Sequence, residues 1–173
     1  MSVNSTASIL VGFNNRIVWI RVVGKGSFHC STSLKDFSRE MINRGHREFV
    51  LDLKDCPVMD STFMGTLAGM ALRLRDVGQG NLHVININER NLDLLQGLGL
   101  DQLFSIDATG LEGGPDTPMA SPASEEQRER ETTSKTMLEA HEALVKADPT
   151  NLTKFKDVLQ YLRQDLDDEP GSD

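Results

Sequence analysis

Three polar side chains, those of Asp60, Ser61 and Thr62, stand directly before a segment whose apolar residues recur at helical spacing. These apolar positions are Met64, Leu67, Ala68, Ala71 and Leu74. The spacing predicts a helix from Ser61 to Val77, and Gly78 follows as a stop. A hydroxyl at a helix start can cap backbone N–H groups that have no partner, and the helix dipole tolerates added negative charge there. Ser61 is therefore expected at a position that suits either capping or a charged group.

No other set of side chains has the spacing of a reactive site. The histidines, at positions 29, 46, 83 and 141, are scattered, and none has a second metal ligand three or four residues away. Asp52 and Asp55 follow a predicted strand, as a phospho-accepting aspartate does, but they lack the further acids that would hold Mg²⁺. Gly24-Lys25-Gly26 is too short for a phosphate loop, and no Gly-x-Ser-x-Gly elbow occurs. A Ser-His-Asp triad has no local signature either, and we predict no metal and no cofactor.

The charge of the chain is concentrated in its tail. Residues 1–111 contain 11 basic and 11 acidic residues, whereas residues 112–173 contain 7 basic and 15 acidic ones, so the whole net charge of −8 lies in the tail. This balance disfavours nucleic acid and anionic membranes as partners, because both are bound through Lys and Arg.

Neither a membrane span nor a secretion signal is visible in the sequence. No apolar run approaches 18 residues, and the amino terminus lacks a basic stretch followed by an apolar one. Cys30 and Cys56 match no metal-site spacing and are interpreted as free thiols of a reducing compartment. We expect a cytoplasmic protein.

The body of the chain alternates between strand and helix patterns. Residues 7–13 and 17–23 are β-branched and aromatic and flank Asn14-Asn15-Arg16, which predicts a β-hairpin. The further predicted strands are 48–53, 82–87 and 103–106, and the further predicted helices are 31–44, with Ser31, Thr32 or Ser33 as its cap, and 89–97. The order ββαβαβαβ predicts an α/β fold with a mixed β-sheet and helices packed on it.

The tail has a different pattern. Six of the fifteen residues from Gly110 to Ser124 are Gly or Pro, so we expect a domain at 1–109, a flexible linker at 110–123 and an acidic helical hairpin at 124–173. Its helices are predicted at 124–147 and from Asp148-Pro149 onward, with two apolar stripes that face each other. The stripes are Met137, Ala140, Leu144 and Ala147, and Leu152, Phe155, Leu159, Leu162 and Leu166. Such short helices need a partner surface, which is the protein's own domain, a second copy in a homodimer, or another protein.

The stretch from Phe49 to Leu67 resembles the STAS domain of bacterial anti-sigma factor antagonists. In that family a strand ending in Asp-Leu, here Asp52-Leu53, leads to an Asp-Ser-Ser/Thr-Gly-Leu/Met-Gly motif at a helix start. Asp60-Ser61-Thr62-Phe63-Met64-Gly65 matches this motif at every position but one, where Phe63 replaces glycine. The resemblance covers roughly residues 7–107 and leaves the helical tail outside it.

The resemblance implies a STAS-like fold and a regulator without enzymatic activity. In the family the serine after aspartate is phosphorylated, which assigns the modification to Ser61, with Thr62 as the alternative. The unphosphorylated protein would bind an anti-sigma factor that is itself a serine kinase of GHKL type. A phosphatase would restore the unphosphorylated protein. Asp60, Ser61 and Thr62 would form the switch, with Phe63 and Met64 as further partner contacts. The Phe63 ring could obstruct a kinase, anchor a partner or pack in the core.

Two other functions compete with this interpretation. One is a STAS subunit of a larger assembly, such as a lipid-transport ATPase complex, in which the serine shapes an interface and is never phosphorylated. The other is a small nucleotide-binding protein or hydrolase, for which the sequence offers no site. A phosphate at Ser61 would add about −1.5 to −2 charge. If a partner complex buries that charge at a free-energy cost of about 3 kcal/mol, its affinity falls on the order of a hundredfold.

Overall fold

Five strands form one mixed sheet in the computed structural model, which describes residues 8–107, 115, 119–122 and 133–167. The strands are β1 (Ser8–Asn14), β2 (Ile17–Val23), β3 (Glu48–Asp52), β4 (Asn81–Ile85) and β5 (Ser105–Asp107), and they lie in the order β1-β2-β3-β4-β5. β1 pairs with β2 as an antiparallel hairpin, and every later pair is parallel. Asn15 allows the tight turn of the hairpin because it adopts a positive φ of 55°.

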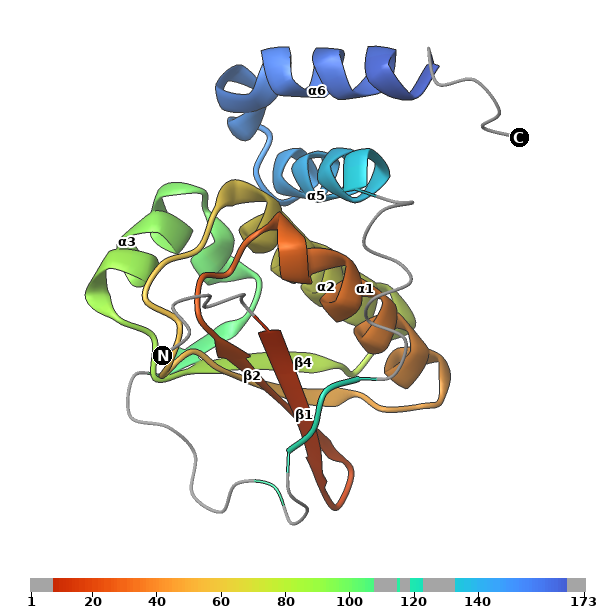
Figure 1. Ribbon diagram of the computed structural model, residues 1–173, viewed down its shortest axis with the longest axis vertical. Coiled ribbons are helices and arrows are strands. Elements are labelled where there is room, and N and C mark those ends of the chain that lie inside the picture. The colour runs from red at the N-terminus through yellow and green to blue at the C-terminus, as the bar shows by residue number, and fades with distance from the viewer. Residues whose placement is uncertain (1–7, 108–114, 116–118, 123–132, 168–173) are drawn as a thin grey trace, which may run out of the picture.

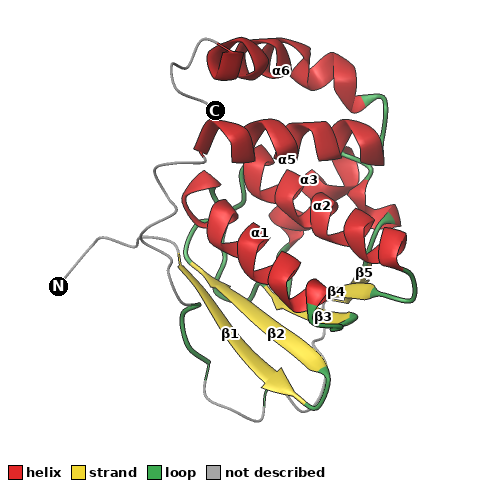
Figure 2. Cartoon of the chain, turned by 90° about the vertical axis from the view of Figure 1, so that its right-hand side faces the viewer, coloured by secondary structure: helices red, strands yellow, loops and turns green. Residues whose placement is uncertain are grey.

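The helices lie on one side of the sheet (Figure 2). They are α1 (Phe28–Asn43), α2 (Ser61–Val77), α3 (Glu89–Gly97), the short 3₁₀ helix η1 (Leu100–Gln102), α5 (Thr133–Ala147) and α6 (Asn151–Asp167). Figure 1 shows three layers of helices above the sheet, with α1 to α3 nearest to it, then α5, then α6. The predicted α/β fold and its order ββαβαβαβ are confirmed, as is the C-terminal pair of helices.

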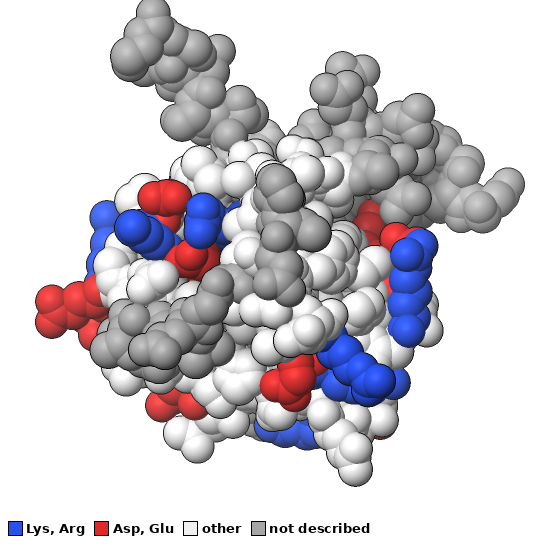
Figure 3. All heavy atoms as spheres, turned by 90° about the horizontal axis from the view of Figure 1, so that it is seen from below, with Lys and Arg blue, Asp and Glu red and all other residues white. Residues whose placement is uncertain are grey.

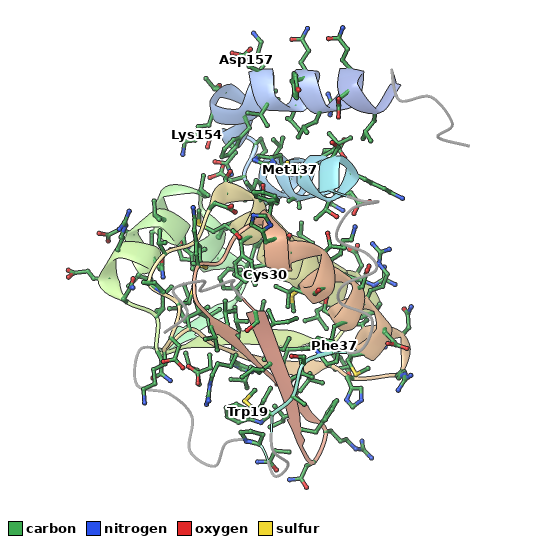
Figure 4. All side chains as sticks on the ribbon, viewed as in Figure 1. Trp19, Cys30, Phe37, Met137, Lys154 and Asp157 are labelled. Atoms are coloured by element: carbon green, nitrogen blue, oxygen red, sulfur yellow. The ribbon has the colours of Figure 1, made fainter. Side chains whose placement is uncertain are left out.

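The two faces of the sheet bury different residues because side chains alternate along each strand. On β2, Val18, Ile20 and Val22 belong to the main core beneath the helices, which also contains Cys30 of α1. Trp19 points the other way and joins a small second cluster. Figure 4 shows Trp19 and Cys30 on opposite sides of the sheet. The helix side therefore holds most of the apolar interior that positions α1 and α2.

One predicted helix start was wrong, and another was confirmed. α1 begins at Phe28, and Ser27 caps it by accepting a hydrogen bond from the His29 amide at 3.3 Å. The predicted caps at 31–33 lie inside the helix instead, where Ser31 donates to the Ser27 carbonyl at 2.9 Å. The predicted cap of the last helix is confirmed, because Asp148 Oδ1 accepts a hydrogen bond from the Thr150 amide at 3.1 Å just before α6, which runs from Asn151. The error in α1 arises because several nearby hydroxyl residues can each cap a helix, and local sequence does not choose among them.

The C-terminal helices form a hairpin that rests on the body of the protein. We call α5 and α6, residues 133–167, the hairpin. The prediction that its two apolar stripes face each other was wrong, because Ala140 and Leu144 are buried where α5 packs on α2. Of the predicted stripe on α6, Leu159 is buried, whereas Leu152 is 49% exposed. Residues 124–132 of the predicted first helix lie outside the described residues.

Part of the predicted linker contacts the sheet. Ala120 forms an antiparallel bridge with Val11 of β1, with N···O distances of 2.8 and 3.0 Å. Met119 packs against the cluster that contains Trp19. A side chain on Gly12 would meet Pro115 and Met119, so this glycine leaves room for the segment that crosses β1. Among the helices described here, none is both long and apolar enough to cross a membrane.

Candidate functional site

Asp60 holds the amino ends of two helices with one carboxylate. Its Oδ1 accepts a hydrogen bond from the Phe63 amide at 2.8 Å and so caps α2. Its Oδ2 accepts from the Phe28 amide, the first residue of α1, at 3.2 Å. A negative charge is stabilised beside both helix starts, because unpaired N–H groups and the helix dipoles point toward it. Asp60 therefore fixes the position of Ser61 relative to α1.

Ser61 is the first residue of α2 and not its cap. Of the two roles considered for this position, the structure does not show capping by the Ser61 hydroxyl, because Asp60 already caps the helix. The Ser61 side chain is half-buried, and its Oγ lies 3.0 Å from Nε2 of His141 on α5. The candidate phosphorylation site is thus in direct contact with the hairpin.

The His141 ring is held so that one nitrogen faces Ser61. Its Nδ1 lies 2.7 Å from the Met137 carbonyl, and since a carbonyl only accepts hydrogen bonds, Nδ1 carries the proton. In the neutral ring Nε2 then has a lone pair and accepts the hydrogen bond from the Ser61 hydroxyl. The ring is only 4% exposed and packs edge-on against Phe155 of α6.

The contact between this serine and histidine can be compared with that of a catalytic pair. A cavity of about 260 Å³ lies nearby, where α1, α2 and α5 meet, but neither Ser61 nor His141 lines it. Its charged lining residues are Lys35, Arg39, Arg73 and Glu139. A serine nucleophile needs a substrate space next to its oxygen and its base, and this cavity does not supply one.

The other residues of the motif face inward. Thr62 and Met64 are 6% and 4% exposed, and Phe63 is fully buried in the main core. The Phe63 ring lies against Gly26, where an added Cβ would come within 2.9 Å of Cδ2. Of the three alternatives for Phe63, the structure shows core packing. Because Gly26 has no side chain, it leaves room for the ring of Phe63, the residue that replaces the glycine of the family motif.

Asp52, which was considered as a phospho-acceptor, has structural partners. Its Oδ2 accepts from Arg21 Nε at 3.3 Å, and its Oδ1 accepts from the Lys54 amide at 2.9 Å and from Asn86 Nδ2 at 3.0 Å. These bonds join β2, β3 and the loop after β4 at the carboxyl ends of the parallel strands. Asp55 is exposed and does not share this cluster.

The two cysteines are buried and not disulfide-bonded. Burial raises the pKa of the Cys30 thiol to about 11 and also raises that of Cys56. A raised pKa lowers the fraction of reactive thiolate at neutral pH, so neither thiol has the properties of a nucleophile. Within the described ranges, no three His, Cys, Asp or Glu side chains gather as a metal site would need.

The exposed face of the sheet does not offer a surface of one charge. Figure 3 views this face and shows Lys and Arg side chains interspersed with Asp and Glu around an uncharged centre. Arg21 and Asp52 form one such mixed pair. A strongly basic patch, which nucleic-acid binding would need, is absent from the part of this face that the structure describes.

Sequence reasoning missed the partner of Ser61. His141 stood among the scattered histidines because its contact with Ser61 spans 80 positions, and no local pattern reports such a pairing. A weak signal was present: Gly65 and Gly69 lie four residues apart on one face of α2, and Ala140 and Ala143 lie three apart on α5. Small residues at such spacing allow two helix backbones to approach closely.

Comparison with known proteins adds the family and the fold. The STAS domain family model matches residues 8–111. Among solved structures, a putative anti-sigma factor antagonist from Thermotoga maritima has 19% identity and a TM-score of 0.53, covering 57% of this chain and 85% of that chain. The anti-sigma factor antagonist SpoIIAA in its unphosphorylated form has 17% identity and a TM-score of 0.51, covering 61% and 91%. The curated proteins include no significant match.

Proposed function

The chain belongs to the STAS domain family, and on that basis we propose that it is a regulatory binding protein whose affinity for its partner is set by phosphorylation of Ser61. The proposed partner is an anti-sigma factor that is also a serine kinase of GHKL type, as the resemblance to anti-sigma factor antagonists implies. A phosphatase restores the unmodified serine. The protein catalyses no reaction in this scheme and acts in the cytoplasm.

The division of roles between Asp60 and Ser61 is the observation that carries the proposal. Because Asp60 caps α2, the Ser61 hydroxyl is not needed to satisfy the helix start. Modification of Ser61 therefore leaves the cap in place. Thr62 is only 6% exposed and its neighbour Ser61 is half-buried, which supports Ser61 as the acceptor.

Phosphorylation places charge at a sensitive point. The Ser61 oxygen bonds to the γ-phosphorus of ATP, the bond to the ADP oxygen breaks, and the hydroxyl proton leaves to a base on the kinase. The product carries about −1.5 to −2 charge beside the Asp60 carboxylate. The helix start tolerates this charge while water surrounds it. A partner that buries the helix start has to desolvate it, which costs about 3 kcal/mol and weakens the complex on the order of a hundredfold.

The proposed partner surface is the start of α2, residues 60–64. Asp60 and Ser61 supply its polar side chains, and both are only partly buried. Thr62, Phe63 and Met64 are buried in the folded chain, so they act by holding the helix start in place. The partner contact thus depends on the main-chain position of α2 as much as on side chains.

Mass spectrometry tests the proposal. We expect the purified protein, incubated with ATP and each GHKL-type kinase of the same genome, to gain about 80 Da, the mass of one phosphoryl group, on the peptide that contains Ser61. Ser61→Ala should abolish the gain and Thr62→Ala should retain it. Phosphate on Thr62 alone would overturn the assignment of the residue.

A second function is favoured by one observation. The hydrogen bond between Ser61 and buried His141 gives the serine a structural role within the chain. In a STAS subunit of a larger assembly, this structural role of Ser61 would be sufficient and no phosphorylation would be required. Absence of phosphate with every kinase, together with isolation of the native protein in a stable complex, would support this second function.

A further inference from the structure

The same face of α2 that begins at Ser61 is covered by the chain's own α5. We call Ser61, Gly65 and Gly69 the switch face, since they lie on one side of α2 at a spacing of four residues. A side chain on Gly65 would collide with the Ala140 carbonyl of α5. One on Gly69 would reach the Ala143 Cβ at 3.8 Å. The backbones of α2 and α5 are therefore in close contact at Gly65, which only glycine permits.

Polar contacts hold α5 in this place from both sides. On α1, Thr32 Oγ1 lies 3.0 Å from Thr136 Oγ1, and Lys35 Nζ forms an ion pair with Glu139 at 3.0 Å. On α2, Ser61 bonds to His141 at 3.0 Å. A fully buried apolar side chain, Leu144, completes the contact with the main core.

The turn end of the hairpin is tied to the last residue of α3 and to the residue that follows it. Lys154 Nζ donates to the Gly97 carbonyl at 2.7 Å, and Figure 4 shows Lys154 at the end of the hairpin nearest α3. Asn151 Nδ2 donates to the carbonyls of Leu98 and Leu144, at 3.0 and 2.8 Å. The hairpin is thus an ordered part of the fold that packs on the outer side of the helix layer (Figure 2).

We propose that α5 is an intramolecular occupant of the switch face, so that a kinase or partner reaches Ser61 only after the hairpin has moved away. This inference rests on the proposed function, because it concerns control of the same surface. The switch face accepts a helix that presents a small residue at the closest approach, as α5 presents Ala140. The partner therefore competes with α5 by inserting a helix with Gly, Ala or Ser at that point.

Occupation by α5 lowers the affinity that a partner experiences. Only the open fraction of molecules can bind, so a hairpin closed in about 99% of molecules weakens apparent binding about a hundredfold. A phosphoryl group on Ser61 would need the space beside Oγ that the His141 ring now fills. Closure of the hairpin and phosphorylation therefore oppose each other, and this coupling acts equally in both directions.

Substitutions that weaken the contacts of α5 with the body of the protein test this. Leu144→Glu places a carboxylate at a fully buried position of α5. Leu152→Glu makes the same exchange at a position of α6 that is 49% exposed, and is the matched control. Glu139→Lys sets a second ammonium group against Lys35, and the double variant with Lys35→Glu restores an ion pair of reversed direction.

Opening is measured first without a kinase. Each full-length chain also carries Ser61→Cys, and the rate of alkylation of residue 61 by N-ethylmaleimide is followed by mass spectrometry. We expect Leu144→Glu to raise this rate about tenfold or more and Glu139→Lys to raise it severalfold. Leu152→Glu and the charge swap should leave it unchanged. Circular dichroism checks that each chain is folded.

Equal alkylation rates in folded Leu144→Glu and Leu152→Glu chains would overturn the proposal. If Leu144→Glu does not fold, Glu139→Lys and its charge swap decide in the same way, and equal rates in those two chains count against occupation by α5.

Phosphorylation by the GHKL-type kinases is then compared in the same hairpin variants with Ser61 intact. Faster phosphorylation of Leu144→Glu than of Leu152→Glu supports control by the hairpin, whereas faster alkylation with equal phosphorylation contradicts it. No phosphate on any chain, Leu144→Glu included, counts against the proposed function, and the alkylation rates still decide whether α5 covers Ser61.

Discussion

Ser61 on α2 and His141 on α5 share a hydrogen bond of 3.0 Å although they are 80 positions apart in the chain. The contact joins the best candidate for a regulated residue to the helical tail, which lies outside the STAS match. The tail is therefore in direct contact with the proposed switch residue. This relationship is the basis for the expectations about the hairpin.

Asp60 should contribute more to stability than an ordinary helix cap, because its carboxylate serves α1 and α2 together. Asp60→Ala is expected to lower the free energy of unfolding by about 2 kcal/mol, the upper end for a cap. Ser27→Ala, which removes a cap from α1 alone, should cost about 1 kcal/mol or less. Urea denaturation measures both, and an equal loss in the two variants would contradict the double role.

The Phe63 ring should be coupled energetically to Gly26. Phe63→Ala removes a fully buried ring and is expected to cost about 3–5 kcal/mol of stability. Gly26→Ala should also destabilise, since its Cβ would approach the ring to 2.9 Å. In a Phe63→Leu background the same Gly26→Ala exchange should cost less. A double-mutant cycle by thermal or urea unfolding measures the coupling, and strict additivity would show that the two sites are independent.

Stability should fall at alkaline pH partly through Cys30. Its pKa is raised by burial from 9.0 to about 11 in the folded protein. Between these values the unfolded chain loses the thiol proton and the folded chain keeps it, so the free energy of unfolding decreases as pH rises, by at most about 1.4 kcal/mol per pH unit. Below pH 9 this contribution disappears.

The control for this pH dependence is Cys30→Ala, which has no thiol at position 30. Urea unfolding at pH 8, 9 and 10 should show a smaller decline in this variant than in the wild type, whereas groups common to both chains affect them equally. Identical slopes in the two proteins would mean that Cys30 titrates alike in both states.

Local patterns were sufficient to predict most elements of the body. The bounds of α2 followed from apolar residues at spacings of three and four and from Gly78, whose φ of 87° ends the helix. The order of strands and helices then restricted the topology, because parallel strands need right-handed crossovers. The cap at Asp60 was not predicted, since Asp60, Ser61 and Thr62 are all competent caps and tertiary contacts decide among them.

The position of the hairpin could not be predicted in the same way. A stripe that contains Ala140 and Leu144 shows which side of a helix is apolar, but not which surface it covers. The protein's own domain, a second copy and another protein all satisfied the pattern. Only the packed structure reveals that Gly65 of the motif accommodates the Ala140 carbonyl. The contact between the Asp60–Gly65 motif and the tail is a long-range property, and it has no local signature in the sequence.

Affinity of the Ser61 variants for the kinase partner tests the central claim most directly. Calorimetric titration compares Ser61→Ala with Ser61→Asp, and thermal unfolding confirms that both are folded, because Asp at a helix start costs within about 1 kcal/mol. We expect Ser61→Ala to bind at least as tightly as the wild type. Ser61→Asp should bind on the order of thirtyfold more weakly, since about 2 kcal/mol is lost when the partner buries the charge. Equal affinities of two folded variants would contradict a charge-controlled switch at Ser61.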